Sequence, residues 1–137
     1  MPDTKPVLEI DGARFDSLDG FYDEVSSALI PGASWGRNLN ALNDILRGGF
    51  GTPENGFVLR WVNSTRSRTT LGYAATCEWL RLMRAGCHPT NQRAVDAKLA
   101  AAEASQGPTL FDVLVEIIEH HGPGGDEAED GVLLVLA

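Results

Sequence analysis

Hydrophobic residues recur at helical spacing within Ser34–Arg47 and predict a short amphipathic helix. Its apolar side carries Leu39, Leu42, Ile45 and Leu46. The opposite side is a wholly polar stripe, which we expect to face away from the core: Asn40, Asn43, Asp44 and Arg47. Asn38 is a good N-cap residue, because its side-chain oxygen can accept from a free backbone N–H of the first turn. An aromatic loop with Trp35 precedes the helix, and a glycine-rich loop from Gly48 follows it.

Similar patterns predict three strands and four further helices. The strands are Val7–Ile10, Gly56–Val62 and the continuous apolar run Val132–Leu136. One helix begins at Asp16 or Ser17 and ends near Leu29, and another begins with a capping-box-like pattern at Thr109. The remaining two are Tyr73–Arg84 and a helix from Pro89 to about Ser105. This order, strand–helix–helix–strand–helix–helix–helix–strand, predicts an α/β fold with a small parallel three-stranded sheet packed by helices.

Charge narrows the possible partners. The 137 residues fit a single domain over 1–137, with 11 basic against 19 acidic residues and a net charge of -8. The acidic excess lies at the two ends of the chain, since residues 109–137 hold seven acids and no base. Such a chain is a poor nucleic-acid binder, because phosphate recognition needs cationic groups. A basic protein is the more suitable partner.

The first residues are polar, and no stretch approaches the ~20 apolar residues of a membrane span. We therefore expect a cytoplasmic protein with no signal peptide and no membrane contact. In that compartment a disulfide between Cys77 and Cys87 is not expected.

Candidate catalytic and metal-binding residues are few. His120-His121 lies among carboxylates and Cys87-His88 adds two further ligands, but adjacent histidines on a helix diverge by about 100°. A metal site needs three or four converging ligands, so we expect no metal and no cofactor. We place His120 in solvent and His121 near the helix end. Acid–base catalysis by the crowded C-terminal carboxylates stays open as an alternative, although no catalytic motif accompanies them.

The segment 34–48 combines core, turn and polar-face residues in a specific order: Trp35, Gly36, Asn38, Leu39, Ala41, Leu42, Asp44, Leu46 and Gly48. This combination resembles the signature of the barstar family, whose members are intracellular inhibitors of small secreted ribonucleases. The chain departs from the family pattern at Ser34, at Asn40 (commonly Asp) and at Asn43, where an aromatic residue can stand.

This resemblance implies a barstar-like fold over about 7–71 and 109–137, with 72–108 as an inserted helical pair like that of larger members, which inhibit ribonucleases of the streptomycete type. It implies a one-to-one complex with a basic, extracellular-type ribonuclease, whose cationic active site an acidic helix blocks, and no enzyme activity of the chain itself. The implied anchor is Asp44, and Glu119 corresponds to a rim glutamate in the last helix. The implied neighbouring contacts are Trp35, Arg37, Asn40, Asn43 and Gly48. The alternatives are a hydrolase, metal-dependent or acid–base, and a barstar-like immunity protein against another toxin class.

Overall fold

Three parallel strands form the base of the molecule. The computed structural model describes residues 5–48, 50–53 and 55–137. Strands β1 (Val7–Asp11), β2 (Phe57–Val62) and β3 (Val132–Leu136) lie in the order β1-β2-β3, and all pairs are parallel. Val58 stands beside Val7 on one side and Leu133 on the other. The predicted α/β class and three-stranded parallel sheet are confirmed.

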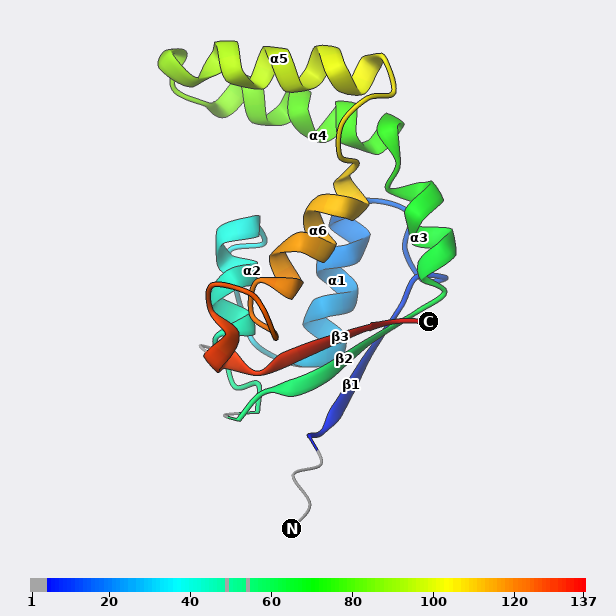
Figure 1. Cartoon of the computed structure of the whole chain (residues 1–137), viewed down its shortest axis with the longest axis vertical. Helices are drawn as coiled ribbons and strands as arrows, with labels where there is room; N and C mark the ends of the chain where they lie inside the picture. Colours follow the sequence, from blue (N-terminus) through cyan, green and yellow to red (C-terminus); the bar gives the residue numbers. More distant parts are fainter. Residues whose placement is uncertain (1–4, 49, 54) are drawn as a thin grey trace.

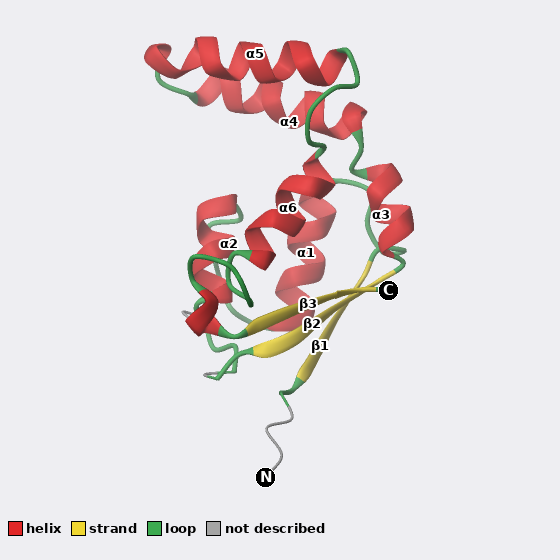
Figure 2. Ribbon diagram, viewed as in Figure 1, coloured by secondary structure: helices red, strands yellow, loops and turns green. Residues whose placement is uncertain are grey.

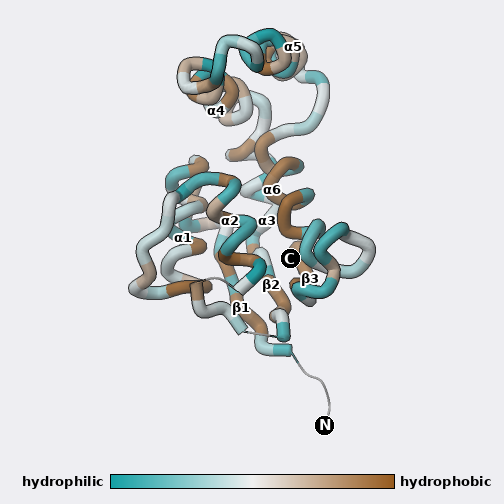
Figure 3. The backbone as a smooth tube through the Cα atoms, turned by 90° about the vertical axis from the view of Figure 1, so that its left-hand side faces the viewer, coloured by the Kyte–Doolittle hydropathy of each residue, from teal (hydrophilic) through white to brown (hydrophobic). Residues whose placement is uncertain are grey.

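Helices α1 (Leu18–Leu29), α2 (Leu39–Leu46) and α6 (Leu110–Glu119) cover one face of this sheet (Figures 1 and 2). The central strand β2 alternates accordingly: Phe57, Leu59 and Trp61 are buried, whereas Arg60 is exposed. Trp61 is fully buried at the centre of the core, where its ring lies beside those of Phe15, Phe21 and Phe111. In Figure 3, α6 is mostly hydrophobic along its length.

Local side-chain hydrogen bonds cap the first turns of α1 and α6, as the sequence predicts. Ser17 accepts from the Gly20 N–H at 3.1 Å and begins α1. Thr109 and Asp112 form a reciprocal capping box at the start of α6. The helix predicted from Pro89 instead opens with a short 3-10 turn, Pro89–Asn91, before α5 (Gln92–Glu103).

Helix α3 (Ser64–Thr70) was missing from the predicted order. Its sequence, STRSRTT, has no apolar stripe, so hydrophobic periodicity gives no signal for it. Tertiary contacts hold it instead. The buried Ser67 hydroxyl accepts from the Trp61 indole N–H at 3.0 Å, and the Arg66 guanidinium donates to the carbonyls of Gly12 and Phe15 at 2.7 Å.

Helices α4 (Tyr73–Gly86) and α5 form a hairpin at one end of the molecule (Figure 1). The hairpin has a small core of its own: Cys77, Leu80, Val95 and Ala102. Thr76 joins it to the main body, because its hydroxyl accepts from the buried Leu110 N–H at 2.6 Å. Cys77 and Cys87 are free thiols.

Candidate functional site

The exposed side of helix α2 is the candidate partner-binding face, and local contacts fix both ends of the helix. At its start, the Asn38 side chain accepts from the Ala41 N–H at 2.8 Å, which confirms the predicted cap. At its end, the buried Thr52 hydroxyl donates to the Ile45 carbonyl at 3.0 Å. Gly48 follows at φ +99°, a conformation that favours glycine, so the chain can leave the helix there.

The loop before α2 is anchored on α1. The Trp35 indole N–H donates to the Ser26 hydroxyl at 2.6 Å, and its ring stands edge-on to the Tyr22 ring at 5.2 Å. The Arg37 guanidinium pairs with Asp23 at 2.8 Å, donates to the Asp19 carbonyl at 3.2 Å and lies 5.7 Å from the Tyr22 ring centre. Burial, together with the nearby Asp19 charge, raises the pKa of Tyr22 to about 12.

Asn43 does not face away from the core, and this part of the prediction was wrong. Its side-chain oxygen lies 2.8 Å from Nε2 of His121, and its amide nitrogen donates to the Leu39 carbonyl at 3.3 Å. His121 is fully buried, and its Nδ1 lies 2.7 Å from the Asp130 carboxylate. Asn43 therefore joins α2 to the segment that follows α6, while Asn40 and Asp44 stay exposed as predicted.

Arg47 makes a second connection to the same segment. Its Nε and Nη2 donate to the two carboxylate oxygens of Glu127 at 2.7 and 2.9 Å, and its Nη1 donates to Asp44 at 3.0 Å. This pairing lowers the pKa of Glu127 and raises that of Arg47, chiefly through the hydrogen bonds between them. One guanidinium thus orients the exposed Asp44 carboxylate and holds the loop against the helix.

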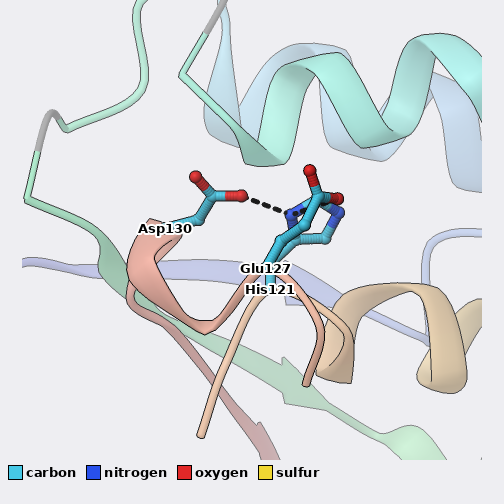
Figure 4. Close-up of side chains that lie close together, drawn as sticks. All are labelled: His121, Glu127 and Asp130. Carbon is cyan, nitrogen blue, oxygen red and sulfur yellow. Dashed lines mark hydrogen bonds and ion pairs between the residues drawn. The ribbon is translucent and has the colours of Figure 1, made fainter. Parts of the chain in front are cut away.

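The loop 122–131 between α6 and β3 folds closely on itself. A Cβ on Gly122 would lie 2.2 Å from the Val132 carbonyl oxygen, so the turn after His121 requires glycine. Within the loop, Glu127 and Asp130 converge on His121 (Figure 4).

These three side chains offer ligand atoms within 4.8 Å of one another, a spacing that suits a metal ion. Their atoms are already engaged: His121 bonds Asn43 and Asp130, and Glu127 bonds Arg47 with both oxygens. We therefore interpret them, with Asn43 and Arg47, as a clamp that holds α2 against the loop, and refer to these five residues as the α2 clamp.

Glu119 belongs to α6 and not to α2. It is exposed at the end of α6 and lines two shallow hollows, one with Glu116 and His120 and the other with residues of β3. Neither hollow is lined by a residue of α2. The structure therefore places Trp35, Arg37, Asn40, Asp44 and Gly48 on or beside α2, turns Asn43 inward and places Glu119 on α6.

The sequence predicts His121 near the end of the last helix but does not reveal its role as a buried link to α2. Periodicity offered a signal, because His121 comes seven residues after the buried Leu114 and three after the buried Ile118. It thus continues the inward-facing stripe of α6 by one turn. A polar residue at such a position requires buried hydrogen-bond partners.

The chain matches the family described as barstar (barnase inhibitor) over residues 5–129. Because this match covers most of its 137 residues, the chain belongs to the barstar family, whose members inhibit barnase-type ribonucleases. A search of curated proteins gave no match. In the described part of the chain, none of the helices has the length and apolar character that crossing a membrane requires.

Proposed function

We propose that this protein is a cytoplasmic inhibitor of one small, basic, guanyl-type ribonuclease of the secreted kind, bound one to one. Membership of the barstar family supports ribonuclease inhibition in general. The net charge of -8 supports a basic partner in particular, because opposite charges speed the encounter of two proteins. In this proposal the chain has no turnover of its own and needs no cofactor.

The Asp44 carboxylate is the observation that best supports this proposal. Its side chain is 58% exposed, yet Arg47 orients it on a helix that is fixed at both ends. A ribonuclease must bind RNA phosphate, so its active site is cationic. A carboxylate held on a rigid helix can take the place of the phosphate and bond Arg with two oxygens. Asp44 would therefore occupy the catalytic centre of the enzyme.

The remaining residues act around this anchor. Asn40 lies one turn before Asp44 on the exposed side of α2, and Trp35, Arg37 and Gly48 flank the helix. Asn43 positions α2 through His121 rather than through contact with the enzyme. We propose Glu119, at the end of α6, as a rim contact.

A barstar-like immunity protein against another toxin class is the second candidate. Asn40 favours this candidate, because it is an exposed amide at a position where the barstar signature commonly has Asp. The hydrolase alternative draws no comparable support, because His121, Glu127 and Asp130 are engaged in the α2 clamp.

The test is to titrate the purified chain into a basic guanyl-type ribonuclease while RNA cleavage and heat of binding are recorded. We expect cleavage to stop at one equivalent, and the chain alone to cleave no RNA. Full ribonuclease activity in the presence of a large excess of the chain would overturn the proposal. Capture of a toxin that is not a ribonuclease would then support the second candidate.

A further inference from the structure

A hollow of about 160 Å³ lies where the α4–α5 hairpin meets the main body. Its walls come from the start of α1 on one side and from α4 on the other. The floor is apolar and includes Ala75, Trp79 and Leu82. We call it the α1/α4 hollow.

Helix α4 has two apolar faces, and one is incompletely covered. Cys77 and Leu80 pack against α5, and Arg81 and Arg84 reach acids of α5 from the same side. The second face runs from Ala75 through Trp79, both of which pack on the main core, to Leu82. Leu82 continues this stripe past the end of the core and is 70% exposed.

Among the residues that the structure describes, the charged side chains lining the hollow are acidic. Asp16 and Asp19 come from the start of α1, and Glu78 comes from α4. All three are exposed, and they surround an apolar floor. Lys and Arg combine a cationic head with an aliphatic stem, so they match both properties of this hollow.

The hollow adjoins the candidate face of α2. Asp19 lines it, and the Asp19 carbonyl accepts a hydrogen bond from Arg37 in the loop that leads into α2. Figure 1 shows the hairpin extending above α2 at one end of the molecule. A partner seated on α2 would therefore meet α4 at the border of the same surface.

We propose that the α1/α4 hollow is a second contact region for the ribonuclease bound at α2, and that it receives a Lys or Arg side chain of that enzyme. Leu82 packs on the aliphatic stem, and Glu78 with Asp19 pairs with the cationic head. This inference rests on the proposed function. It gives the α4–α5 hairpin a role in affinity and in the choice of partner, in addition to the central contact of Asp44.

The test compares Leu82→Ala and Glu78→Lys with the unaltered chain in binding to a basic guanyl-type ribonuclease. We expect each to weaken binding by about tenfold or more, through lost apolar contact in the first and charge repulsion in the second. Arg93→Ala, on α5 and outside the hollow lining, and Asp96→Asn, which alters the ion pair from α5 to Arg84 of α4, serve as controls that should leave binding unchanged. Thermal melts establish that each variant is folded.

The outcomes separate this inference from the proposed function. If the unaltered chain inhibits and Asp44→Ala does not, but both hollow variants bind normally, only the hollow is excluded as a contact region. If the unaltered chain binds no ribonuclease, the proposed function fails and this inference with it. A self-associated chain that Leu82→Ala converts to a monomer would show that a second copy covers the hollow, and would also overturn the inference.

Discussion

The Nε2 atom of the buried His121 lies 2.8 Å from the side-chain oxygen of Asn43, although 78 residues separate them. The Asn43 amide nitrogen donates to the Leu39 carbonyl, so the Asn43 oxygen faces the His121 ring. Nδ1 lies 2.7 Å from the Asp130 carboxylate and donates there. His121 is thus buried between an amide and a carboxylate, just beyond the C-terminus of α6.

Replacing His121 by Leu should destabilise the fold. It would remove the ring that both the Asn43 side chain and the Asp130 carboxylate bond in a largely buried setting, at a cost of about 2–4 kcal/mol in free energy of unfolding. Urea unfolding measures this cost. His120→Leu is the matched control, because the His120 side chain is 46% exposed and its loss should be felt little. Equal stability of the two variants would contradict a stabilising role for the α2 clamp.

Glu127→Gln should lower stability in a pH-dependent way. Arg47 holds the pKa of Glu127 below its ordinary value of 4.5, so the ionised carboxylate stabilises the folded state. This contribution to stability is fully present above the pKa that Glu127 has in the unfolded chain. It is lost as the pH falls through the lower pKa that Glu127 has in the folded chain. Melting temperatures should therefore differ between the unaltered chain and the variant at neutral pH, and converge below about pH 4.5. Glu129→Gln, in the same loop, is the control. A difference that persists undiminished into strong acid would refute the prediction.

Asp44→Ala should abolish tight binding while the fold survives. Within the complex, the cations that surround the carboxylate would be left buried and unpaired, which costs roughly 3–5 kcal/mol and mainly speeds dissociation. In the free chain the loss is small, since an exposed ion pair contributes little and Arg47 keeps both bonds to Glu127. Dissociation rate and thermal melt are measured together. Asp96→Asn removes a similarly exposed carboxylate from its arginine and should not affect binding. A normally folded variant that still dissociates slowly would rule out Asp44 as the anchor.

Asn40→Asp should strengthen ribonuclease binding by about tenfold, because it adds a second carboxylate one turn before Asp44. Its effect on folding should be small. The new charge lies in the first turn of α2, where the helix dipole favours it, but it repels Asp44 four residues later. Calorimetric titration gives the change in affinity, and Asn40→Ala separates a gain from the carboxylate from a simple loss of the amide. Weaker binding by Asn40→Asp would mean that the partner is adapted to the amide.

Association with the ribonuclease should slow as salt is raised. A charge of -8 attracts a basic partner over distances that ions screen within about 8–10 Å at ordinary ionic strength. We expect the association rate to fall more than tenfold between about 0.05 and 0.5 M salt, with a smaller change in dissociation. Stopped-flow mixing measures both. An association rate that is the same across this range would exclude electrostatic steering.

The sequence by itself determined the elements whose signals are local. The caps at Ser17, Asn38 and Thr109 could be predicted because each side chain bonds a backbone N–H only three residues ahead. Periodicity likewise predicted the buried side of α2 and the exposure of Asp44. Helix α3 lacked any such pattern and was missed, since its stability comes from contacts with Trp61 and with the loop before α1.

Only the tertiary structure decided what lies behind the candidate face. Asn43 comes four residues after Leu39 and borders the apolar stripe of α2, so a helical pattern leaves its direction open. Its direction is set by His121, and that of Arg47 by Glu127, 78 and 80 residues away along the chain. Folding brings these partners together because α2 and α6 pack on the same face of the sheet. Residue spacing within one helix cannot predict such long-range contacts. A buried polar group must be hydrogen-bonded, but its partner can come from any part of the chain that folding places beside it.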